Sequence, residues 1–110
     1  MPMGDMSQAE EKTAALLAAL WVKVRPMVEE RVAVLEAAAA AATSGALGEA
    51  QRTEASSAAH KLAGSLGMYG YDEGTAMARK IEVLLGEAAP DAVRLKALNA
   101  ELRRAVFPKG

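Results

Sequence analysis

Apolar residues recur every three or four positions along most of this chain of 110 residues. That spacing places them on one face of an α-helix, which makes one turn about every 3.6 residues. The composition favours the same structure, because 26 residues are alanine, whereas only 4% are of the aromatic types that strands prefer. The sequence therefore predicts an all-α protein, and no segment shows the alternating pattern of a strand.

Proline and glycine residues divide this pattern into five predicted helices. The first is expected from about Gln8 to Arg25, where Pro26 breaks or bends the helix because proline lacks an N–H group. The others are expected at about residues 26–43, 47–69, 73–85 and 91–106. Short links favour antiparallel neighbours, so we expect an up-down bundle in a single domain of residues 1–110, with loose tails at 1–6 and 107–110.

Each predicted helix has an apolar stripe that is expected to face the core. The stripes consist of Leu17, Leu20, Trp21 and Val24; Val28, Val32, Leu35, Ala39 and Ala42; Ala55, Ala58, Leu62, Leu66 and Tyr69; Met77, Ile81 and Leu84; and Val93, Leu95, Leu98, Leu102 and Val106. Arginines of the last two helices, Arg103 among them, are expected on solvent-exposed faces. Asp72 and Glu73 are expected to cap the fourth helix rather than bind a metal.

Charge and residue content exclude several classes of function. The 13 basic and 14 acidic residues leave no positive excess for a nucleic-acid surface, and the absence of cysteine excludes thiolate metal sites and disulfides. A single histidine excludes any metal site that needs two. The apolar run at residues 13–22 is too short to cross a membrane, so we expect a cytoplasmic protein. Without a phosphate loop or a catalytic triad, a self-sufficient enzyme is not expected.

His60 lies inside the third predicted helix and is the strongest candidate for a reactive side chain. At about 100° per residue, the core stripe of that helix falls on the side opposite to His60. The residues that surround His60 are instead small or polar: Thr53, Ser56, Ser57, Gly64 and Gly67. The histidine is therefore expected to point away from the core.

Two glycines on the His60 face support a functional role. Glycine in a helix interior costs about 1 kcal/mol relative to alanine, so Gly64 and Gly67 are expected to leave room for a partner beside the imidazole. An imidazole is largely neutral and nucleophilic at pH 7, and Lys61 is within reach of an anion held near it. The alternative is that His60 is an incidental surface residue and that the glycines let a neighbouring helix approach.

The segment around His60 resembles the phosphorylation motif of histidine-containing phosphotransfer (HPt) domains. The matching residues are Ala59-His60, Leu62, Gly64-Ser65, Gly70 and Ile81-Glu82, which together span about a quarter of the chain. The resemblance implies an antiparallel four-helix bundle with an additional N-terminal helix.

The resemblance also implies that His60 accepts a phosphoryl group from a receiver-domain aspartate and passes it to another receiver. Lys61, Gly64 and Ser65 would then lie beside the phosphoryl group. The docking face would include Ser56, Ser57, Gly67 and Met68. The chain would bind no cofactor or metal, because the receiver brings Mg²⁺, and its partners would be receiver domains and a hybrid histidine kinase.

One position departs from the family pattern. Ala63 stands where many members have a lysine three residues after the histidine, and Lys61 is the candidate replacement. This departure keeps open a helical interaction module in which His60 is never phosphorylated. A separate alternative is the phosphorylated domain of a chemotaxis-type kinase, modified by an ATP-binding domain. A monomer is favoured, although a first helix that swung away at Pro26 would allow an exchanged dimer.

Overall fold

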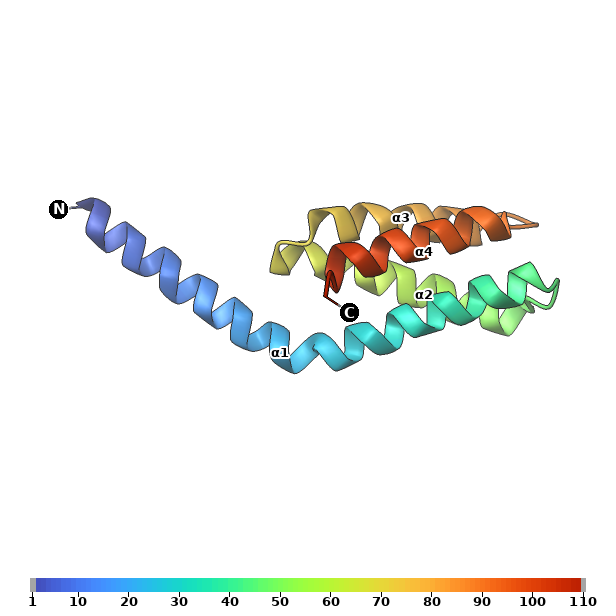
Figure 1. Ribbon diagram of the computed structural model, residues 1–110, viewed down its shortest axis with the longest axis horizontal. Coiled ribbons are helices and arrows are strands. Elements are labelled where there is room, and N and C mark those ends of the chain that lie inside the picture. The colour runs from blue at the N-terminus through green and yellow to red at the C-terminus, as the bar shows by residue number, and fades with distance from the viewer. Residues whose placement is uncertain (1, 110) are drawn as a thin grey trace.

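The computed structural model describes residues 2–109 (Figure 1). Within that range the chain forms four α-helices: α1 (Pro2–Thr43), α2 (Glu49–Ser65), α3 (Asp72–Leu85) and α4 (Ala92–Val106). A short 3-10 helix, η1 (Leu66–Tyr69), follows α2 directly. The prediction of an all-α protein is confirmed, since residues 2–109 contain no strand.

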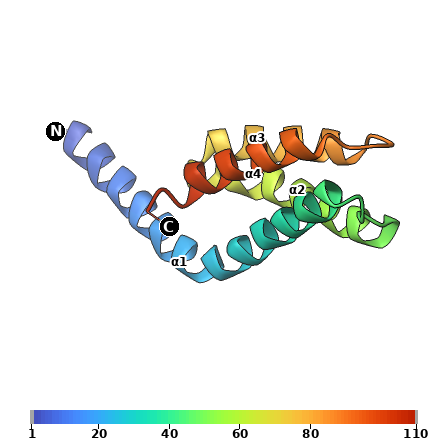
Figure 2. The ribbon, with the colours of Figure 1, turned by 45° about the vertical axis from the view of Figure 1, so that its right-hand side comes forward.

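Pro26 is an interior residue of α1, a single helix of 42 residues. The additional N-terminal helix expected before this proline is therefore not a separate element but the first half of α1. Proline removes one hydrogen bond and collides with the carbonyl four residues earlier, which here bends the helix instead of ending it. Both ribbon views show the change of direction (Figures 1 and 2). Residues 2–6, expected to be a loose tail, belong to the same helix.

The second half of α1 packs with the other three helices around one core. Contacts join α1 to α2, α2 to α3, α3 to α4 and α4 back to α1, which closes the ring. Consecutive helices lie side by side and reverse direction at each short connection (Figure 2). The first half of α1 extends past the end of this group, so the molecule measures 62 × 23 × 20 Å.

The core consists of aliphatic and small side chains from all four helices. Its largest fully buried members are Val32, Leu35, Leu62, Leu66, Ile81, Leu85, Leu95 and Leu102. The predicted stripes are thus confirmed for most positions from residue 28 onwards. Val93 is the exception, with 81% of its surface exposed. It lies two residues before Leu95 and therefore on nearly the opposite side of α4.

All four aromatic residues of the chain meet where α1 leaves the bundle, and we call them the aromatic cluster. The Trp21 ring centroid lies 5.4 Å from that of Tyr69, 4.8 Å from that of Tyr71 and 6.1 Å from that of Phe107. Phe107, expected in a loose tail, is only 5% exposed and belongs to the core. Since aromatic pairs at these distances are stabilising, the cluster holds α1 against the end of the bundle.

Two polar contacts join α4 to α1. In the core, the side-chain amide of Asn99 donates to the carbonyl of Leu35 at 2.9 Å. Towards the surface, Nε and Nη2 of Arg103 donate to the two carboxylate oxygens of Glu36 at 2.9 and 2.8 Å. This bidentate bond raises the pKa of Arg103 above its ordinary value. Arg103, expected on a solvated face, is half-buried, and its ion pair was not predicted because Glu36 lies on a helix distant in sequence.

Two substitutions in α4 test the assignment of its core face. Leu102 is fully buried, so Leu102→Ala is expected to lower the free energy of unfolding by about 2–5 kcal/mol through lost burial and a residual cavity. Val93→Ala, at an exposed site of the same helix, is expected to change it by no more than about 0.5 kcal/mol. Urea unfolding followed by circular dichroism measures both. A large effect of Val93→Ala would contradict the structure and restore the sequence expectation.

Candidate functional site

His60 lies in the middle of α2 on the face turned away from the core, as the sequence predicted. Its side chain is 77% exposed. The opposite face of α2 consists of the buried residues Ala55, Ala58, Ala59 and Leu62. Because Ala59 immediately precedes His60 and is fully buried, the histidine backbone is held directly on the core.

A carboxylate of α3 orients the imidazole ring. Nδ1 of His60 lies 3.0 Å from Oε2 of Glu82, whose side chain is 34% exposed. A carboxylate can only accept a hydrogen bond, so the neutral ring must carry its proton on Nδ1. The lone pair of Nε2 is then free. Glu82 belongs to the family motif but was not predicted as a site residue. The sequence signal that could have identified Glu82 was its position directly after Ile81, which is buried.

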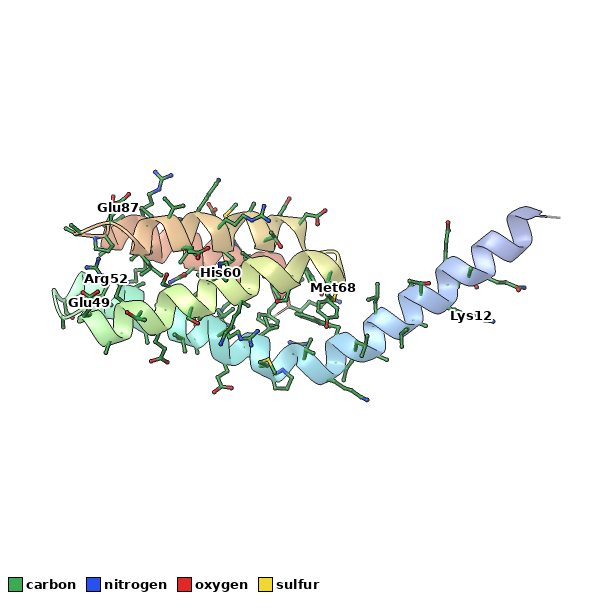
Figure 3. The ribbon with its side chains drawn as sticks, turned by 180° about the vertical axis from the view of Figure 1, so that it is seen from behind. Lys12, Glu49, Arg52, His60, Met68 and Glu87 are labelled. Atoms are coloured by element: carbon green, nitrogen blue, oxygen red, sulfur yellow. The ribbon has the colours of Figure 1, made fainter. Side chains whose placement is uncertain are left out.

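His60 and Glu82 line an open depression between α2 and α3. The other lining residues are Glu49, Arg52, Thr53, Ser56, Ser57, Leu85 and Gly86. Figure 3 shows His60 near the centre of this face, with Arg52 and Glu49 further along α2. Two of the residues predicted for the docking face, Ser56 and Ser57, therefore lie beside the histidine.

Arg52 is a cation of this depression that sequence reasoning missed. Its guanidinium donates to the backbone carbonyls of Glu87 and Ala88, in the connection between α3 and α4. These bonds tie the beginning of α2 to the end of α3. The only sequence signal was its place two turns before His60, which does not reveal its partners.

Lys61 and Ser65, predicted to lie beside a phosphoryl group, have other surroundings in the unphosphorylated chain, and that prediction stays a prediction. Lys61 lines the adjacent groove between α1 and α2, together with Met27 and Val34, and does not line the depression around His60. The hydroxyl of Ser65 donates to the backbone carbonyl of Lys61 at 2.9 Å. The hydroxyl proton of Ser65 is thus engaged in a hydrogen bond within α2.

The two glycines of the His60 face have different surroundings. A Cβ atom added at Gly64 would meet nothing within 4 Å, so no packing inside the chain requires glycine there. At Gly67 it would lie 3.4 Å from Oγ1 of Thr75 and 3.8 Å from a carboxylate oxygen of Asp72. Gly67 therefore lies against the beginning of α3, as the alternative interpretation held. Gly64 leaves open surface next to His60.

Met68 and Gly70 complete the end of this face. Met68 is 64% exposed in η1 and lies beyond the end of α2 in Figure 3. Gly70 has φ of +87°, a left-handed conformation that glycine adopts without strain, and it turns the chain from η1 into α3. This tight turn sets α2 and α3 side by side.

Outside the depression around His60, the described residues contain no metal-binding cluster and no membrane-spanning helix. Within residues 2–109, no group of three or more histidine, aspartate or glutamate side chains is placed to hold a metal ion. Asp72 and Glu73 lie in the first turn of α3, where negative charge favours the helix dipole, but neither makes a side-chain cap. In the same described range, no helix has the length and apolar character needed to cross a membrane.

Comparison with known proteins gives one match. A family model described as the Hpt domain matches residues 19–106. No curated protein and no solved structure matches the chain. The matched range contains His60, Glu82 and the whole of α2, α3 and α4, but it begins inside the first half of α1.

The tautomer of His60 provides a direct test of the contact with Glu82. Glu82→Ala removes the acceptor that holds the proton on Nδ1, so the Nε2-protonated form is expected to become populated. Nitrogen-15 shifts of the imidazole measure the ratio of the two forms above pH 8. Glu54→Ala, which removes an exposed carboxylate from α2, is the control and should leave the spectrum unchanged. Identical spectra for Glu82→Ala and the wild type would show that the contact is absent in solution.

Proposed function

Because this chain belongs to the Hpt domain family, whose members have a phosphotransfer role in two-component signalling, we propose that it carries a phosphoryl group on His60. The observation that carries the proposal is the environment of the ring. Nδ1 is held by Glu82, whereas Nε2 belongs to a side chain that is 77% exposed. One nitrogen is thus oriented by the protein, and the other is open to a partner.

In the proposed reaction, His60 accepts the group from the phosphorylated aspartate of a receiver domain. The lone pair of Nε2 attacks phosphorus in line with the bond between phosphorus and the aspartate oxygen. The new N–P bond forms as that P–O bond breaks, and the aspartate leaves as a carboxylate. No proton has to leave the ring, because Nε2 carries none at the start.

Glu82 then has a second role in the phosphorylated state. The substituted ring keeps its Nδ1 proton and gains positive charge, which the carboxylate of Glu82 offsets through the same hydrogen bond. In the return step, the carboxylate of a second receiver attacks phosphorus, the N–P bond breaks, and His60 leaves as neutral imidazole. The direction of the relay, from a hybrid kinase to a further receiver in the cytoplasm, is part of the same proposal.

The partner supplies the remaining charge neutralisation. We expect the Mg²⁺ for this chemistry on the receiver, so the chain itself needs only a reachable nucleophile. Lys61 is exposed and Arg52 lies in the wall of the depression, so both give positive charge near the docking face. That face consists of Ser56, Ser57, Gly64, Gly67 and Met68 around His60.

Transfer from a phosphorylated receiver domain tests the carrier role. The wild type is expected to acquire acid-labile, base-stable phosphate, whereas His60→Gln is expected to acquire none, because the chain has a single histidine. Unchanged circular dichroism would show that the variant still folds. The readout is radiolabel on this chain after gel separation in neutral and acid conditions.

Each other outcome of that assay contradicts the receiver-to-histidine route. Label that persists in His60→Gln would place the acceptor elsewhere. No label from any of several receivers would favour the interaction module, for which Ala63 in place of lysine is the supporting feature, and Ala63→Lys is the matching repair. Label obtained only from an ATP-dependent kinase domain would favour the chemotaxis-type alternative.

Gly64 provides a test in which stability and transfer should move in opposite directions. Gly64→Leu places a side chain in open space, so it is expected to raise the free energy of unfolding by about 0.5–1 kcal/mol through helix propensity. The same side chain would obstruct the receiver, slowing transfer about tenfold for each 1.4 kcal/mol of docking energy lost. Ala76→Leu, at an exposed position of α3, is the control. Undiminished transfer by Gly64→Leu would exclude Gly64 from the docking face.

A further inference from the structure

The first half of α1 contains a segment that is apolar on every side. Residues 13–22 have the sequence TAALLAALWV, with no charged residue over almost three turns. Helices that are apolar all round are normally buried. Here Leu16 is 61% exposed, Leu20 39% and Val22 71%. We call residues 8–24 the arm and residues 13–22 its belt. The bundle of the same chain leaves much of the belt uncovered.

A cleft separates the arm from the end of the bundle. Its arm side consists of Ala14, Leu17, Ala18 and Trp21, and its other side consists of Tyr69 and Tyr71. The cleft has a volume of about 320 Å³ and is open to solvent. Figures 1 and 2 both show the first half of α1 diverging from the bundle. The cleft is thus an apolar surface against which a further helix could pack.

The charges at the two ends of the belt indicate which element fits. On the side of the arm that faces the cleft, Glu10 precedes the belt and Arg25 follows it, whereas Lys12 and Lys23 lie on nearly the opposite side of the helix. A second arm that ran parallel would place Glu10 beside Glu10 and Arg25 beside Arg25, whereas an antiparallel arm places Glu10 beside Arg25 at both ends. Such opposite pairs favour one orientation and register. The arm is therefore complementary to a copy of itself.

We propose that the cleft binds the arm of a second copy of this chain, antiparallel and related by a two-fold axis. The axis passes beside Leu17 and Ala18, at the centre of the belt. In that register, small Ala14 faces the large Trp21 of the second copy, and Glu10 faces Arg25 of the second copy. A two-fold axis repeats both contacts, as expected for an isologous dimer. Burial of the cleft-facing side chains of both arms, Ala14, Leu17, Ala18 and Trp21, supplies the driving force.

This pairing leaves the histidine face open. No residue that lines the cleft also lines the depression around His60. Two copies joined by their arms would present two separate His60 faces at the ends of an elongated particle. The inference is independent of the proposed phosphotransfer, and a monomeric chain would still be able to carry a phosphoryl group.

Cysteine crosslinking tests the two-fold axis, because the chain has no cysteine of its own. Ala18→Cys lies next to its counterpart in the proposed dimer, so mild oxidation is expected to yield a disulfide-linked dimer. Ala19→Cys is the matched control, because position 19 is turned about 100° further round the helix, away from the cleft. Equal crosslinking of the two variants, or none in either, would overturn the proposal.

Sedimentation equilibrium over a concentration series tests the association itself. The wild type is expected at twice the chain mass, Ala18→Glu as a monomer, and Ala19→Glu still as a dimer. Glu10→Arg is expected to weaken the dimer, and the double variant Glu10→Arg with Arg25→Glu to restore it. A wild type that stays monomeric throughout would overturn the proposal and leave a lipid surface or an unrelated protein as the cover of the belt.

Discussion

Close packing of α2 against α3 is the constraint on which the site depends. Both helices bury small side chains, since Ala55 and Ala59 of α2 and Ala78 of α3 have no exposed surface. Small side chains let the helix axes approach, and the left-handed Gly70 closes the connection between them. His60 follows buried Ala59, so its backbone rests on this interface. Glu82 follows buried Ile81 in the same way, and the two side chains meet at the rim, where Nδ1 and Oε2 are 3.0 Å apart.

The packing of α4 against α1, on the other side of the bundle, depends on polar and aromatic contacts. The bidentate bond between Arg103 and Glu36 and the amide bond from Asn99 to Leu35 set α4 against the second half of α1. The aromatic cluster then determines where α1 departs, because Trp21 contacts both η1 and the residue after α4. Arg25 lies 5.1 Å from the ring centroid of Phe107 and extends the cluster towards solvent. A bent helix, and not a loop, therefore connects the bundle to the arm.

Much of the fold was predictable because helical periodicity is a local property. The spacing of apolar residues predicted α2, α3 and α4 to within a few residues, and it predicted that His60 points outward. Local reasoning failed where a distant partner decides the outcome. The burial of Phe107 depends on Trp21, and the position of Arg103 depends on Glu36. The exposure of Val93 is a different case, because its angle round α4 was already available from the sequence.

For the site, the sequence by itself determined the nucleophile, its outward direction, the small residues around it and the family motif. These follow from residue identity and from the turn of one helix. Only the tertiary structure decided which nitrogen of His60 is held, that Lys61 lies in a neighbouring groove, and that Gly67 lies against α3 while Gly64 faces open space. It also decided that Pro26 bends α1 and that the bundle leaves much of the apolar belt uncovered. The reason is physical: the pattern within a helix sets directions around its own axis, whereas distances between helices depend on how their side chains pack together.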